Sequence, residues 1–154
     1  MVYSNQAEEA VPMSIVTTGH TRVIPGSFGK SLQRVRRHLA DAGLSIAGEF
    51  DLSDEPLFQL GDGSRSCVVL LVDDPALLFE CIVLDRAAAV FVPVHVVISG
   101  DRDTTYVHWA NPAAASGLRL PIPAKKPLEE LCARINKALS ELPVAAEPVL
   151  MESR

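Results

Sequence analysis

The chain has 154 residues, of which 48% are hydrophobic and 21% are charged, and its formal net charge is −5. This length is that of one ordinary domain, and the apolar content excludes a mainly disordered chain. The acidic balance argues against a general nucleic-acid-binding protein, because such proteins need an excess of Lys and Arg. The apolar runs are shorter than the about 20 residues of a membrane helix, and residues 1–10 lack the pattern of a secretion signal. We therefore expect a cytoplasmic protein that contacts neither nucleic acid nor membrane.

The first half of the chain predicts two strands around one helix. β-Branched residues dominate positions 14–24 and predict a strand, which Pro25 and Gly26 end. Ser27 has the side chain of an N-cap, and Gly43 is a typical helix stop. Between them, apolar residues recur every three or four positions and draw one stripe: Phe28, Leu32, Val35, Leu39 and Ala42. Residues 44–52 predict a short second strand, and residues 53–65 predict a loop.

The second half predicts three further strands and two helices. Residues 67–72 form a continuous apolar run, which is typical of a central strand. Asp74 and Pro75 are a typical helix start, and residues 76–84 are apolar on nearly every side, which predicts a deeply buried helix. Residues 92–99 and 104–109 predict a hairpin. Four prolines predict irregular structure over 111–127, and leucine spacing predicts a last helix over 128–142, with Glu130 and Arg134 paired on its outer face.

The resulting order, β-α-β-β-α-β-β-α, predicts the α+β class. We expect one domain over residues 12–142, with loosely packed or mobile termini at 1–11 and 143–154. A strand–helix–strand start followed by a hairpin and a final helix favours a single, mostly antiparallel sheet with helices packed on one face. The other face of such a sheet is left for water, a ligand or a second copy of the chain to cover.

In the order of its predicted elements and in the residues that begin and end them, the chain resembles the bacterial and archaeal domain-of-unknown-function family 302. The likeness covers about residues 15–142 and depends on short structural markers: Gly43-Leu44, Asp74-Pro75, the segment from Ala87 to Val92-Pro93, and Asn111-Pro112. The resemblance implies a TATA-binding-protein-like α+β fold and a homodimer, and it brings no established activity. In many members a Cys follows the Pro that opens the fourth strand. Here Val94 stands at that position, so no role for such a thiol is implied.

The cysteines and the short catalytic motifs give little support for a familiar chemistry. Cys67, Cys81 and Cys132 have no CxxC spacing, so we interpret them as buried thiols in a reducing compartment. The sequence also lacks the Gly-x-Ser-x-Gly, His-Glu-x-x-His and dinucleotide-binding patterns. These absences lower the expectation of a common hydrolase, metalloprotease or dehydrogenase and leave the question of an enzyme open.

The predicted hairpin carries the residues with the most chemical potential. If residues 100–103 form the turn, the register places His95 directly opposite His108, with the Cβ atoms about 4.5–5.5 Å apart. Tyr106 lies on the same face of the sheet. Two imidazoles at that separation could share a metal ion or flank a haem iron. His95, Tyr106 and His108 are therefore the predicted ligand-binding residues, and the two histidines are the predicted metal ligands.

A structural interpretation of the histidine pair stays open. A one-residue slip in the hairpin register sends the two rings to opposite faces. Two histidines are also too few for a closed metal site, so His20, Cys67 or an acidic residue would have to complete it. Otherwise, His95 and His108 are a satisfied polar pair in the sheet or in a dimer interface.

A basic helix face is the second candidate site. The side of the first helix opposite its apolar stripe can bind phosphate groups or an acidic partner, although a solvated helix surface is the commoner explanation. Its residues are Lys30, Arg34, Arg36, Arg37 and His38.

The sequence favours one function and leaves two alternatives. The favoured hypothesis is a non-catalytic homodimeric module that binds a small ligand, a metal or haem through His95, Tyr106 and His108. The first alternative is an enzyme that uses the two histidines for acid–base chemistry on a small molecule. The second is a purely structural dimer in which the open sheet face is only an interface.

Overall fold

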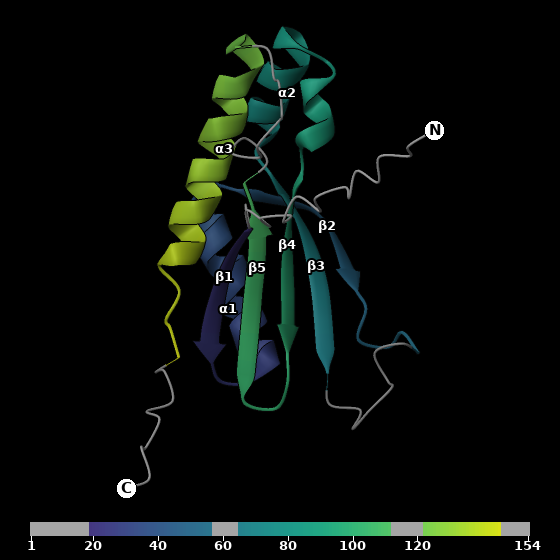
Figure 1. The fold of residues 1–154 in the computed structure, drawn as a ribbon, viewed down its shortest axis with the longest axis vertical. Coiled ribbons are helices and arrows are strands. Elements are labelled where there is room, and N and C mark those ends of the chain that lie inside the picture. Colours follow the sequence, from purple (N-terminus) through teal and green to yellow (C-terminus); the bar gives the residue numbers. More distant parts are fainter. Residues whose placement is uncertain (1–18, 57–64, 112–121, 146–154) are drawn as a thin grey trace, which may run out of the picture.

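The computed structural model describes residues 19–56, 65–111 and 122–145 (Figure 1). The elements follow one another as strand β1 (Gly19–Pro25), helix α1 (Phe28–Asp41), strands β2 (Ser45–Asp51) and β3 (Ser66–Asp73), helix α2 (Pro75–Leu84), the 3₁₀ helix η1 (Ala88–Phe91), strands β4 (Val94–Gly100) and β5 (Thr104–Ala110), and helix α3 (Ile122–Ser140). The strands form one sheet in the order β1-β5-β4-β3-β2, and each neighbouring pair is antiparallel. The predicted element order and α+β class are confirmed.

The helices of the described chain gather on one side of the sheet. Strands β1 and β2 lie at opposite edges, so α1 crosses behind the sheet to join them (Figure 1). Helix α3 packs against both α1 and α2. Alternation along the strands follows from this arrangement: Val96 and Ile98 of β4 are fully buried toward the helices, whereas His95, which precedes Val96, points the other way and is exposed. The expected division into a helix-covered face and an open face is therefore present.

The core is built from the predicted apolar stripes. Helix α1 buries Val35 and Leu39 completely, and α3 buries Leu131, Ile135 and Leu139 completely. The flanking members of the α1 stripe, Phe28, Leu32 and Ala42, are partly buried against the same cluster. The helix-facing side chains of β3 and β4 complete it, so the core lies between the sheet and the three helices.

The hairpin register differs from the predicted one by two residues. Ser99 pairs with Tyr106 and Gly100 with Thr105, because the turn is centred one residue later in the chain than expected. The Asp101 N–H donates to the Thr104 carbonyl at 3.0 Å, and the Asp101 carboxylate accepts the Thr104 N–H at 3.0 Å. These bonds centre the turn on residues 102–103 instead of on the four residues 100–103. A shift of two residues leaves every side chain on its predicted face.

The expected deep burial of the helix at 76–84 is wrong. Its start is as predicted: the Asp74 carboxylate accepts the N–H groups of Ala76 at 2.8 Å and Leu77 at 3.3 Å. However, only Leu77 and Cys81 of α2 are buried, and Phe79 is 68% exposed. Because α2 projects beyond the end of the sheet and packs mainly on α3 and η1, much of its surface has no protein neighbour (Figure 1).

The last helix also differs from its prediction. It begins at Ile122, so irregular structure was wrongly expected for the end of segment 111–127, and Pro127 lies buried inside the helix. Residues 112–121 lie outside the described residues. The ion pair of Arg134 is with Asp74 and not with Glu130, because α3 packs across the start of α2.

The chain ends are described only in part. Residues 1–18 and 146–154 lie outside the described residues, and with them the predicted loose segment 1–11, the start of the strand expected over 14–24 and most of the tail. Immediately after α3, the Ala145 N–H donates to the Val23 carbonyl of β1 at 2.8 Å. The first residues of the tail therefore run beside the edge strand of the sheet. In the part of the chain that the structure describes, no helix has both the length and the hydropathy to cross a bilayer.

Candidate functional site on the open sheet face

The open face of the sheet carries all three residues predicted for the site, but His95 and His108 line one hollow and Tyr106 lines another. His95, Tyr106 and His108 all point away from the helices, since each alternates with buried residues along its strand. Apolar side chains from neighbouring strands share this face, because Leu71 pairs with His95 and Val69 pairs with Val97. The face is therefore a half-apolar surface with three polar aromatic rings.

The two histidines are diagonal neighbours and not a directly opposed pair. Val97 lies directly opposite His108 in the sheet. His95 lies two residues before Val97, on the same side of β4. Diagonal neighbours are separated by about 7–8 Å, still within reach of ring side chains that hold one molecule between them. The predicted direct pairing of His95 and His108 is corrected by this register.

His108 is held in place by two contacts. Its Nδ1 atom lies 3.0 Å from the Thr21 hydroxyl, which β1 presents from the edge of the sheet. Its ring stacks on that of Tyr106, with ring centroids 6.4 Å apart and planes inclined by 5°. The bond at Nδ1 leaves Nε2 as the nitrogen that is available to a ligand. Thr21 was not predicted as part of the site, because its pairing with His108 depends on a contact between distant segments.

A shallow hollow of about 410 Å³ lies between the two histidines. Its polar groups come from His20, Thr21, His95 and His108, and Val97 and Trp109 also line it. Gly19 and Ala110, which pair across β1 and β5, leave room because their side chains are small. A second hollow of about 230 Å³ shares His95 and Ala110 with the first and extends to Val90 of η1. The site thus continues from the sheet to the edge of the α2–η1 region.

Of the additional metal ligands proposed from the sequence, His20 lines the hollow of the histidine pair and Cys67 does not. His20 is exposed at the edge of the sheet and stacks on Trp109, with ring centroids 5.3 Å apart, and both rings line the same hollow as His95 and His108. Cys67 is buried, and burial raises the pKa of its thiol, which disfavours the thiolate that binds metals. Among the described residues, no group of three or more His, Cys, Asp or Glu side chains is arranged to hold a metal ion. Metal or haem binding by His95 and His108 stays a prediction.

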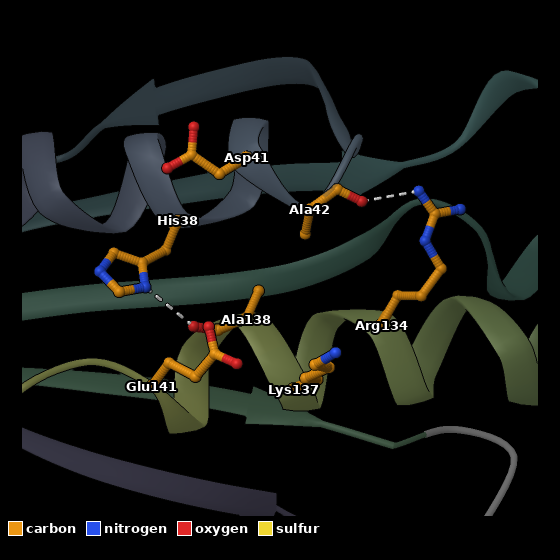
Figure 2. A pocket seen from close by; sticks show the side chains of 7 residues that line it. All are labelled: His38, Asp41, Ala42, Arg134, Lys137, Ala138 and Glu141. Carbon is orange, nitrogen blue, oxygen red and sulfur yellow. Dashed lines mark hydrogen bonds between the residues drawn. The ribbon is translucent and has the colours of Figure 1, made fainter.

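A larger hollow of about 450 Å³ lies between α1 and α3, away from the open face. Figure 2 shows its lining, which comes from the last turns of the two helices: His38, Asp41, Ala42, Arg134, Lys137, Ala138 and Glu141. The His38 Nδ1 atom donates to the Ala138 carbonyl at 3.2 Å. The sequence could not identify this hollow, because its two walls are about a hundred residues apart.

The Arg134 side chain, which lines this hollow, already stabilises the fold through its contacts. The Arg134 guanidinium donates to the Ala42 carbonyl at 2.8 Å and to the Gly43 carbonyl at 3.1 Å, at the end of α1. It also pairs with Asp74, the N-cap of α2, and this pairing holds the pKa of the Asp74 carboxyl below its usual range. Arg134 therefore connects α3 to the end of α1 and to the start of α2. We assign this hollow a role in stability.

Two side chains of the basic face of α1 likewise form contacts within the fold. Arg36 pairs with Glu49 of β2, and His38 bonds to α3. Lys30, Arg34 and Arg37 remain exposed on the helix. Nothing in their geometry distinguishes them from a solvated helix surface.

Fold and open face together define a small α+β protein with an antiparallel sheet that is covered by helices on one side. The chain belongs to the family described as domain of unknown function DUF302, whose model matches residues 20–142. The crystal structure of an uncharacterized conserved DUF302 protein from Bacillus stearothermophilus is similar to it, with a TM-score of 0.68 and 17% sequence identity. That likeness covers 80% of this chain and 96% of the other, and it shows the fold. No curated protein matches the chain in sequence.

Proposed function

We propose that the protein is a non-catalytic, homodimeric binding module that holds a small ligand on the open face of its sheet. The observation that carries the proposal is that His95 and His108 line one hollow on the face that no described helix covers, with Tyr106 beside His108 on the same face. A hollow with a few convergent polar groups and an apolar base is the usual form of a small-molecule site.

The arrangement favours a small planar ligand with a hydrogen-bonding group. The parallel rings of Tyr106 and His108 offer a stacking surface, and Val97 offers an apolar contact between the histidines. The Nε2 atom of His108 and the ring of His95 can then bond a polar group at the rim of the ligand. A metal-centred planar group such as haem fits this description only with a further axial ligand or a second copy of the chain.

Two further features are part of the proposal. A second copy would cover apolar surface that the described chain leaves open, such as Phe50 on β2, which is 57% exposed. We also propose that the protein acts in the cytoplasm. Its three cysteines are buried and form no disulfide, which suits a reducing compartment.

One contact favours an enzyme as the second candidate. The Thr21 hydroxyl at 3.0 Å from His108 is the kind of hydroxyl–imidazole pair in which a histidine activates a nucleophile. The Thr21→Val substitution separates the two functions, because it preserves the shape of the site and removes the hydroxyl. A binding module keeps most of its affinity in this variant, whereas an enzyme of this type loses its turnover.

The proposal is tested by two-dimensional amide NMR with small probes. Benzoate and imidazole serve as planar probes, and cyclohexanecarboxylate serves as a non-aromatic control. We expect the planar probes to shift the amides of Thr21, Val97 and His108, and we expect the His95→Ala/His108→Ala variant to lose these shifts. His38→Ala, in the groove between α1 and α3, should keep them. Shifts that are absent from the open face, or that survive the double substitution, would refute the proposal.

A further inference from the structure

Three of the four histidines of the chain line the hollow of about 410 Å³ at the open face. His20 comes from β1, His108 from β5 and His95 from β4, and all three side chains are exposed. The strands that carry them are neighbours in the sheet. One opening is therefore bordered by three imidazole rings from separate segments of the chain.

The lining of this hollow, as far as the structure describes it, contains no carboxylate. Its other members are uncharged: Gly19, Thr21, Val97, Trp109 and Ala110. In the whole chain, by contrast, Asp and Glu outnumber Lys and Arg by 19 to 14. The three imidazoles are the groups of this lining that can become charged, and their charge is positive. The hollow therefore attracts an anion and has no acidic side chain to repel it.

The charged and titratable side chains of the adjoining elements do not change this balance. Arg22 of β1 donates to a main-chain carbonyl just after α3, at 2.8 Å. Asp73 of β3, two residues beyond the partner of His95, does not line the hollow. Tyr106 of β5 contributes a phenol, which is uncharged at neutral pH. Residues 87–93, which include η1, contain no charged side chain.

We propose that the ligand of this site is a small planar carboxylate and that protonated imidazoles hold it. This inference rests on the proposed function, and it adds the charge of the ligand and the dependence of its binding on pH. Imidazole is the side chain whose charge changes between about pH 5 and pH 8. An anion favours the protonated rings, so its binding takes up protons and strengthens as the pH falls.

The contact between Thr21 and His108 suits both protonation states of the ring. The Thr21 hydroxyl lies 3.0 Å from Nδ1 of His108, and a hydroxyl both donates and accepts hydrogen bonds. It can donate to Nδ1 of the neutral ring, and it can accept the Nδ1–H of the charged ring. In the charged ring, the Nε2–H then donates to a carboxylate oxygen in a charge-assisted hydrogen bond. Thr21 is therefore a positioning residue that does not fix the charge of the imidazole.

A metal cation fits the same lining less well than an anion does. Metal ions bind neutral imidazoles, and a divalent ion would find no carboxylate in this lining to offset its charge. Across residues 19–56, 65–111 and 122–145, no group of three or more His, Cys, Asp or Glu side chains has the arrangement of a metal site.

The single tryptophan of the chain allows a direct test. Trp109 lines the hollow, so its fluorescence reports on a probe that binds there. Benzoate is the anionic probe, and benzamide is an uncharged probe of the same shape. We expect benzoate to bind at least about tenfold more tightly at about pH 6 than at about pH 8, because the imidazoles gain their protons over this range. Benzamide should bind equally at both pH values.

Substitution of the histidines assigns the effect to this hollow. In the His20→Gln/His95→Gln/His108→Gln variant, the side chains stay polar but cannot be protonated. At about pH 6 this variant should bind benzoate no more tightly than the wild type does at about pH 8. His38→Gln, in the hollow between α1 and α3, is the matched control and should keep the full gain. Circular dichroism melting shows whether each variant is folded. A gain that survives the triple substitution, or that His38→Gln abolishes, would overturn the inference.

Failure of this inference can be distinguished from failure of the proposed function. Equal binding of benzoate and benzamide at both pH values would refute the anionic ligand and leave the open-face site in place. Binding of neither probe would refute both proposals.

Discussion

The two faces of the sheet use the same strands for different purposes. On the helix side, residues such as Ile98 are fully buried, and the charged groups around the helices pair with each other or with main-chain carbonyls. On the open side of the same strand, His95 is exposed, and Val97, which adjoins Ile98 along β4, is half-buried. The difference teaches that strand alternation separates the residues of the core from those of the proposed ligand site, so single substitutions on adjacent residues should have distinct consequences.

The largest contrast is expected between two neighbours on β4. Ile98→Ala should lower the free energy of unfolding by about 2–5 kcal/mol, because it leaves a cavity in the closed core. Val97→Ala removes two methyl groups from the half-buried open face and should cost about 1 kcal/mol. Urea denaturation of both variants measures the difference. Equal losses would show that the open face is as tightly packed as the helix side.

The next largest effect is expected at the junction of the three helices. Arg134→Ala removes the bonds to Ala42 and Gly43 and leaves Asp74 without its ion-pair partner. Because hydrogen bonds to charged groups contribute about 1.5–3 kcal/mol, we expect a loss of about 2–3 kcal/mol by thermal or urea denaturation. Arg37→Ala, on the exposed side of α1, is the matched control and should change stability by less than about 0.5 kcal/mol. Similar effects of both variants would contradict the bracing role of Arg134.

Two adjacent carboxylates should respond to pH with opposite signs. The pKa of Asp74 is lowered by its bond to Arg134, so its contribution is present above the unfolded pKa and is lost as pH falls through the folded pKa. Asp74→Asn should therefore destabilise the protein at neutral pH by about 1 kcal/mol, and the difference should fade in acid. Burial raises the pKa of Asp73, so its charge opposes folding once pH exceeds the unfolded value. Asp73→Asn should stabilise at neutral pH, and this gain should also fade in acid. Unfolding curves measured from pH 3 to 7 check both signs.

The smallest effect is expected from a buried hydroxyl on α1. Ser31 is fully buried, and its Oγ atom has no hydrogen-bond partner within the described structure. Ser31→Ala removes the unsatisfied group and raises helix propensity, so it should stabilise the protein by about 0.5–1 kcal/mol. Ser140→Ala, an exposed serine at the end of α3, should change stability less. Destabilisation by Ser31→Ala would mean that the hydroxyl contributes to packing or to a bond on the helix side.

The sequence predicts those features that depend on local chemistry. The α1 stripe, the Asp74 N-cap and the faces of His95 and His108 all follow from residues within a few positions of each other. The hairpin register could not be predicted, because it depends on where the turn is centred, and the bonds of Asp101 to Thr104 place that centre at residues 102–103. The exposure of α2 depends on where the helix lies beyond the sheet, and composition does not encode that position. Thr21 and Arg134 meet their partners only after distant elements pack together.

The most direct test of the open-face site is native mass spectrometry of the purified, untagged protein, with the His95→Ala/His108→Ala variant measured beside it. We predict a dimer of the wild type that carries additional bound mass, and a variant dimer without it, because the proposed ligand contacts are those of the two histidines. A wild type without additional mass, or a variant that retains the same mass, would contradict a ligand site at His95 and His108.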